Sequence, residues 1–139
     1  VYYQANRESP VFEELKTLMV KTAGISDVLR TALSGIASRI EVAFIYGSIA
    51  EMSERAASDV DILVIGDVEF ADVTKSLRPA EETLRREINP MVMPVKEFRE
   101  KIRAKHHFLS TVLESPKIFL WGGEDELRKV VGRGLVKKA

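Results

Sequence analysis

Two aspartates at the start of an apolar segment are the residues of this chain best placed to do chemistry. Asp59 and Asp61 are separated by Val60 and lead into Ile62–Ile65. If the segment is a β-strand, both carboxylates point to the same face, about 6 to 7 Å apart along the chain. Burying an ionised carboxylate without a partner costs several kcal/mol, and a divalent cation is a natural partner for two of them. Because magnesium takes a few carboxylates together with substrate phosphate oxygens, the pair predicts a magnesium site.

A Gly-Ser turn comes ten residues before the aspartates. Gly47 lets the backbone approach a phosphate closely, and the hydroxyl and backbone N–H of Ser48 can donate to its oxygens. The preceding segment 40–46 is β-rich and mostly apolar, so we expect a buried strand that delivers this turn beside the carboxylates. A Gly-Ser pair alone is usually a plain turn, and Asp-x-Asp alone is more often a cap or a surface pair. Together and in this order they predict phosphoryl or nucleotidyl transfer, which needs metal ions and bound phosphates.

The two segments resemble the signature of the minimal nucleotidyltransferases of the DNA polymerase β superfamily. The residues that carry the resemblance are Phe44–Ala50 and Ala57–Val64. It covers about Ile40 to Trp121. It implies a nucleotidyltransferase fold, with ATP or another NTP as co-substrate together with Mg²⁺. It further implies that a nucleoside monophosphate, with AMP expected before other nucleotides, is transferred to a hydroxyl of a protein or small molecule. It also implies that Gly47 and Ser48 bind the nucleotide. Asp59 and Asp61 would be the magnesium ligands and belong to the catalytic set.

One departure from the family pattern lies directly after the Gly-Ser turn. The family commonly continues Gly-Ser-x-Ala with Arg-Gly, whereas this chain has Glu51 and Met52. An acid thereby replaces a cation that would face the phosphates, and its negative charge should repel a triphosphate.

A second departure concerns the third carboxylate that the family places on a neighbouring strand as general base and metal ligand. In the matching segment 87–93 this place is held by Asn89, which we take as the third member of the catalytic set with Asp59 and Asp61. An asparagine can ligate a metal weakly but cannot accept a proton. Glu87 has the same strand parity and is the alternative. Whether the chain is an enzyme is therefore left open.

Several functions follow from these residues and stay open. The first is a Mg²⁺-dependent nucleotidyltransferase. The second is a nucleotidyltransferase-like module that binds a nucleotide or a partner protein without turnover, as part of a transcriptional regulator or a toxin-antitoxin pair. The resemblance suggests a helical partner protein that supplies the acceptor, as in such pairs. The third is a DNA-binding regulator: residues 1–6 with Ser9 and Pro10 resemble the last wing strand and exit of a winged-helix domain, so nucleic-acid binding would belong to a domain outside this chain.

Size and composition restrict the class of protein. With 139 residues, 45% of them hydrophobic and 30% charged, the chain has the composition of a globular protein with one core. Its 21 basic and 21 acidic residues balance, so its net charge gives no tendency to bind nucleic acid. It has no cysteine, which excludes thiolate metal sites, disulfides and cysteine nucleophiles. No signal peptide is visible and no apolar run reaches the roughly 18 residues of a membrane span, so we expect a cytoplasmic protein without membrane contacts.

The pattern of apolar residues and helix caps predicts the elements that position these side chains. The fold class is α/β (α+β), a mixed β-sheet flanked by helices with an N-terminal helical extension. We expect an extension over 1–36, made of a short strand and two helices, and a nucleotidyltransferase-like domain over 37–139. Expected strands are 1–5, 40–46, 59–65, 87–93 and 117–121, and expected helices are 10–22, 26–34, 70–88, 95–114 and 124–131.

Three residues refine these expectations. Ser26 is expected to cap its helix. Pro79 should start a second piece within 70–88, because a proline inside a helix kinks or restarts it. Pro90 favours an edge position for strand 87–93, because it cannot donate a ladder hydrogen bond.

Three other side chains are of types that can contact a ligand. His106 and His107 fall in the middle of the expected helix 95–114 and point about 100° apart, so we expect surface or partly buried positions rather than a shared metal site. Trp121, at the end of an apolar strand, is expected to be a core residue rather than a cover for a nucleotide base.

Overall fold

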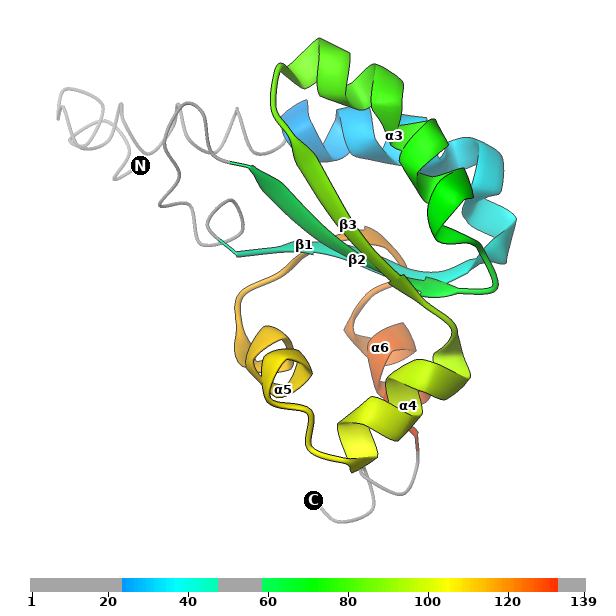
Figure 1. Cartoon of the computed structure of the whole chain (residues 1–139), viewed down its shortest axis with the longest axis vertical. Coiled ribbons are helices and arrows are strands. Elements are labelled where there is room, and N and C mark those ends of the chain that lie inside the picture. The colour runs from blue at the N-terminus through cyan, green and yellow to red at the C-terminus, as the bar shows by residue number, and fades with distance from the viewer. Residues whose placement is uncertain (1–23, 48–58, 133–139) are drawn as a thin grey trace, which may run out of the picture.

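The computed structural model describes residues 24–47 and 59–132, and their centre is one mixed four-stranded sheet. The strands lie in the order β3-β2-β1-β4 (Figure 1). β1 pairs antiparallel with β2 and with β4, and β2 pairs parallel with β3. The strands are β1 Ile40–Tyr46, β2 Val60–Gly66, β3 Ile88–Met93 and β4 Ile118–Trp121. The predicted mixed sheet is therefore confirmed.

Helices cover both faces of this sheet (Figure 1). The helical residues 24–33 and helix α3 lie on one face, and helices α4, α5 and α6 lie on the other. The bounds are η1 Ser34–Arg39, a 3₁₀ helix, then α3 Phe70–Leu84, α4 Val95–Arg103, α5 His107–Glu114 and α6 Glu124–Val131. The described residues thus form three layers, which confirms the predicted α/β class with a sheet flanked by helices.

Two core layers follow from the alternation of side chains along the strands. Ile45 of β1 packs on the face covered by residues 24–33 and α3, together with Leu29. Its neighbour Phe44 packs on the opposite face, together with Phe98 of α4. Because helices cover both faces, β1 and β2 are apolar along most of their length instead of alternating between apolar and polar residues.

Strand β3 forms one edge of the sheet, as Pro90 predicted. The N–H of Val60 donates to the carbonyl of Glu87 at 2.9 Å, so odd-numbered residues of β3 turn their backbone groups toward β2 and even-numbered residues turn theirs outward. Pro90 holds an outward position and has no N–H to expose. The outward N–H of Ile88 donates to Oε2 of Glu81 at 2.9 Å. Two outward positions of this edge therefore present no open donor.

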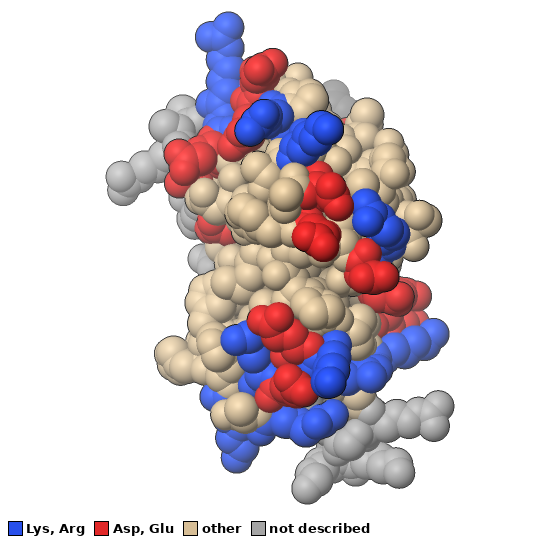
Figure 2. Space-filling view, turned by 45° about the vertical axis from the view of Figure 1, so that its right-hand side comes forward, with Lys and Arg blue, Asp and Glu red and all other residues tan. Residues whose placement is uncertain are grey.

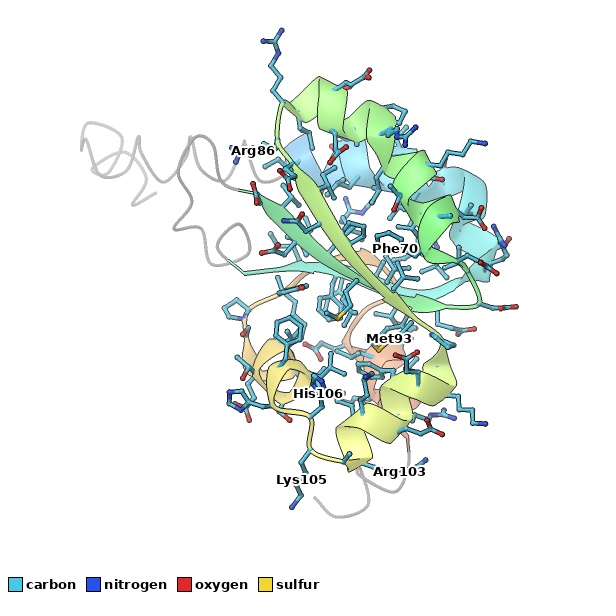
Figure 3. The ribbon with its side chains drawn as sticks, viewed as in Figure 1. Phe70, Arg86, Met93, Arg103, Lys105 and His106 are labelled. Carbon is cyan, nitrogen blue, oxygen red and sulfur yellow. The ribbon has the colours of Figure 1, made fainter. Side chains whose placement is uncertain are left out.

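The helix expected over 95–114 is two helices, so that prediction was wrong. Between α4 and α5, Lys105 adopts a left-handed φ of 59°. His106 then caps α5, with Nδ1 accepting from the N–H of Leu109 at 3.4 Å. Both histidines therefore lie at the start of a helix and not in its middle. Figure 3 shows His106 where the chain enters α5. The apolar residues that recur at helical spacing in this stretch are buried all the same: Phe98, Ile102, Leu109 and Val112.

Two smaller predictions were also wrong. Pro79 lies inside the single helix α3 instead of starting a second piece. The buried residues of α3 lie on both sides of the proline: Val73, Leu77 and Ala80. Their packing on the core stabilises the helix across the missing N–H. Ser26 lies inside the helical residues 24–33 and is buried, so it is not a cap.

Several predictions concern residues outside the described ranges, among them strand 1–5, helix 10–22, Ser48 and Glu51. The division into an extension over 1–36 and a domain over 37–139 stays a prediction. None of the helices within residues 24–47 and 59–132 combines the length and the apolar character that crossing a membrane requires.

Candidate functional site

Tyr46, Asp61 and Asn89 form a row across three neighbouring strands, where β1 ends and β2 and β3 begin. Asp61 is the Cα partner of Tyr46 on β1 and of Asn89 on β3. Asp61 and Asn89 point to the face covered by α4, α5 and α6, because Leu63 and Met91, two residues further along, pack into that core. The fold therefore brings residues from distant parts of the chain to one end of one sheet face.

The amide of Asn89 joins the two predicted metal ligands. Its Nδ2 lies 3.3 Å from Oδ2 of Asp59 and 3.4 Å from Oδ1 of Asp61, and it donates to both. Both hydrogen bonds are longer than the usual N–H···O range. Asp59 and Asn89 are exposed, whereas Asp61 is half-buried. The two carboxylates thus converge on the amide nitrogen of Asn89, at the exposed end of the row.

Gly47 lies directly against Asp61. Its φ of +83° falls in the left-handed region that favours glycine. A Cβ at this position would lie 2.9 Å from Oδ2 of Asp61. Glycine is thus needed here for its backbone conformation and for the space beside the carboxylate. Ser48, the other predicted nucleotide contact, lies outside the described residues.

The electrostatics of the row favour an added positive charge. Burial raises the pKa of the Asp61 carboxyl, the hydrogen bond from Asn89 opposes this rise, and the charge of Asp59 adds to it. Burial also raises the pKa of the Tyr46 hydroxyl, and the negative charge of Asp61 raises it further. A cation between the carboxylates would offset these effects by favouring the ionised form of Asp61.

The two carboxylates suit a hard cation that takes most of its other ligands from water and from a substrate. Two converging carboxylates fit Mg²⁺, which usually completes its shell with water and phosphate oxygens. Within the described part of the chain, no three histidine or acidic side chains gather as a metal site. Glu87, the alternative third carboxylate, therefore does not join Asp59 and Asp61 there. Asn89 holds the third position instead.

Two aromatic side chains beside the carboxylates were not among the predicted site residues. The ring of Tyr46 meets the ring of Phe108 on α5 edge to face, with 6.0 Å between centroids and 74° between planes. Tyr46 also contacts the buried Phe44, with 6.3 Å between centroids. Phe108 nevertheless keeps 40% of its surface exposed. The sequence carried little signal for this position, since Phe108 stands beside Leu109 in a stretch that predicts one long helix with both residues available to its core.

Trp121 does not belong to the row of site residues. Trp121 pairs with Ala43 and is partly buried against the core on the opposite face of the sheet from the carboxylates, so it does not cover this site. In Figure 2, Lys and Arg side chains are interspersed with Asp and Glu over the upper and lower parts of the view, with a band of uncharged residues between them. On α4, for example, Lys101 pairs with Glu97 at 3.8 Å. This face therefore lacks the single-sign basic patch that is typical of nucleic-acid binding.

The row of side chains lies within a recognisable family domain. The model of the Polymerase beta, Nucleotidyltransferase family matches residues 31–112, more than half of the chain. That range contains β1, β2 and β3 with both carboxylates and Asn89. The chain therefore belongs to this nucleotidyltransferase family, and the resemblance seen in the sequence is confirmed.

Two solved structures share the fold. One is a crystal structure of the toxin-antitoxin MntA-HpeT in a mutant form, with a TM-score of 0.57 and 11% identity over 81% of this chain and 86% of that one. The other is a toxin-antitoxin with AMP-PNP, with a TM-score of 0.54 and 10% identity over 81% of this chain and 86% of that one. At these identities the likeness concerns the fold. A comparison with curated proteins gave no match.

Proposed function

We propose that this protein transfers a nucleoside monophosphate to a hydroxyl group in a Mg²⁺-dependent reaction. ATP, as the donor of AMP, is the first nucleotide proposed. The observation that carries the proposal is that the Asp59 and Asp61 carboxylates meet at the amide of Asn89, with Asp61 directly beside the Gly47 turn. Membership of the nucleotidyltransferase family supports the reaction class. A structure of the same fold with AMP-PNP supports a nucleotide as the ligand.

Each described residue has a distinct part in the proposed reaction. Asp59 and Asp61 would hold Mg²⁺, which when bound neutralises charge on the phosphates and on the leaving group. Gly47 leaves backbone room for the polyphosphate where a side chain would meet Asp61. The acceptor hydroxyl oxygen bonds to the α-phosphorus, and the bond from that phosphorus to the bridging oxygen of the β-phosphate breaks. Pyrophosphate leaves with that electron pair, and the hydroxyl proton passes to water, because Asn89 has no basic atom.

Incubation with labelled ATP and MgCl₂, followed by detection of transferred label and of pyrophosphate, tests this proposal. Asp59→Asn and Asp61→Asn keep the side-chain shape and remove the charge, so each should lower the rate roughly 100-fold or more, because the metal contributes several kcal/mol to the transition state. Asp125→Asn is the matched control, since Asp125 is an exposed carboxylate on α6. Full activity in both site variants would refute the proposal.

Asn89 favours a second function, a nucleotide- or partner-binding module without turnover in a transcriptional regulator or a toxin-antitoxin pair. Its amide already donates to both carboxylates and cannot act as a general base. The same assay decides between the two functions. The wild-type chain would show no turnover, whereas Asn89→Asp combined with Glu51→Arg would create it. A folded double variant that gains nothing would count against this second function.

We also propose a protein partner that supplies or orients the acceptor hydroxyl. The support is that both solved structures of the same fold described above are toxin-antitoxin structures. A nucleic-acid partner reached through a domain outside this chain and a cytoplasmic location stay predictions.

A further inference from the structure

Phe108 is an exposed aromatic ring on the same sheet face as the carboxylates. It packs edge to face on Tyr46, whose Cα partner on β2 is Asp61. We propose that Phe108, supported by Tyr46, is the surface on which the base of the bound nucleotide stacks. The inference rests on the proposed function, because it names the base subsite of the same nucleotide.

The burial pattern of α5 shows that Phe108 is not needed for the core. The residues that anchor this helix are Leu109 and Val112, which are 1% and 3% exposed. Phe108 is far less buried than these two residues and keeps 40% of its surface open even after its contact with Tyr46. An apolar ring that is left partly in water beside a polar site is available to cover an apolar or aromatic group of a ligand.

A series of ring contacts holds this surface in place. Phe119 meets the fully buried Phe44 at 5.6 Å between centroids, Phe44 meets Tyr46 at 6.3 Å, and Tyr46 meets Phe108 at 6.0 Å, all edge to face. The ring at the surface is thus supported from the core outward. A rigid ring loses little conformational freedom when a base stacks on it, which favours binding.

The position also suits the chemistry of a nucleotide. Its polyphosphate would lie at Gly47 and the two carboxylates, and its base would extend along the sheet end toward α5. Every base has an aromatic face, so stacking of this kind tolerates different bases. The structure therefore assigns to Phe108 a contribution to nucleotide affinity without strong base preference.

Isothermal titration with two ligands tests the inference: ATP, and tripolyphosphate, which has no base, each with MgCl₂. Phe108→Ala should weaken ATP binding about five- to tenfold, the lower part of the range for loss of one stacked base, and leave tripolyphosphate binding unchanged. Phe108→Leu keeps the apolar bulk without the aromatic face and should also weaken ATP selectively. Phe70→Ala is the matched control, because Phe70 is 57% exposed at the start of α3 on the opposite face (Figure 3).

The outcomes separate this inference from the proposed function. The stacking role alone would be overturned if the wild-type chain binds both ligands and ATP affinity is unchanged in Phe108→Ala and Phe108→Leu. The exposed ring would then be interpreted as a contact for a protein partner. An equal loss for ATP and tripolyphosphate would also overturn it, because the ring would then act on the phosphate site. A wild-type chain that binds neither ligand would overturn the proposed function and the inference together.

Discussion

Replacing Asn89 by aspartate would put a third negative charge where an amide now joins two carboxylates. At the present separations of 3.3 and 3.4 Å, each new pair of charges repels by about 1.2 kcal/mol in a water-like dielectric. Two hydrogen bonds are also lost, and because both are long and exposed each contributes at most about 1 kcal/mol. Because exposed side chains relax away from one another, we expect Asn89→Asp to lower the free energy of unfolding by about 2 to 4 kcal/mol without metal. In a chain of this size this corresponds to a fall in Tm of roughly 6 to 16 °C.

Magnesium should reverse this loss. Three carboxylates form a stronger cation site than two, and a ligand at about 100 times its Kd adds about 2.7 kcal/mol of stability. The assay is thermal unfolding followed by circular dichroism, in EDTA and in excess MgCl₂. Asn89→Leu is the control, since it removes the hydrogen bonds and adds no charge, and Mg²⁺ should raise its Tm less than that of Asn89→Asp because only two carboxylates remain. The reasoning is refuted if both variants melt alike in EDTA, or if Mg²⁺ raises the Tm of neither.

Two further predictions concern the same row. Burial raises the pKa of the Asp61 carboxyl, so the folded protein favours the protonated form of this side chain. The resulting stability is fully present below the unfolded pKa of about 3.9 and is lost as the pH rises through the higher folded pKa. Asp61→Asn should therefore exceed the wild type in unfolding free energy at about pH 7 in EDTA and match it near about pH 3; a difference independent of pH in urea unfolding would contradict this. Gly47→Ala should lose about 1 to 2 kcal/mol because of its positive φ, and more from the contact with Asp61. Gly35→Ala, with nothing within 4 Å of its Cβ, should be close to neutral, and equal losses in both variants would contradict the role of Gly47.

Local signals predicted the elements whose ends are marked in the sequence. The strand expected over 40–46 and the helix expected over 124–131 match β1 and α6, because Gly47 stops the first and the Gly-Gly pair before Glu124 starts the second. The break between α4 and α5 carried no such signal. Ile102 and Leu109 are seven residues apart in the sequence, which is nearly two turns of a straight helix. This separation fits one continuous helix, so it gives no sign of the turn at Lys105.

The candidate site divides in the same way. The shared direction of Asp59 and Asp61 follows from the two-residue repeat of a strand and needs no knowledge of the fold. The contact of Asn89 with both depends on β3 lying beside β2 in one register, which the residues of either strand alone do not specify. The exposure of Phe108 depends on the rotation of α5 about its own axis. That rotation is set by the packing of Leu109 and Val112 against residues distant in the sequence.

The edge strand β3 bears on how a partner can bind. Of its outward positions, Pro90 has no N–H and Ile88 donates to Glu81. Pro94, the next outward position after the strand, also has no N–H, which leaves Val92 as the outward position with an N–H to offer. A chain that tried to extend the sheet here would find one donor where a regular ladder needs several, so strand addition and edge-to-edge aggregation are both disfavoured. Backbone pairing at this edge therefore offers a partner few donors, and the free protein is protected from joining its own copies through this edge.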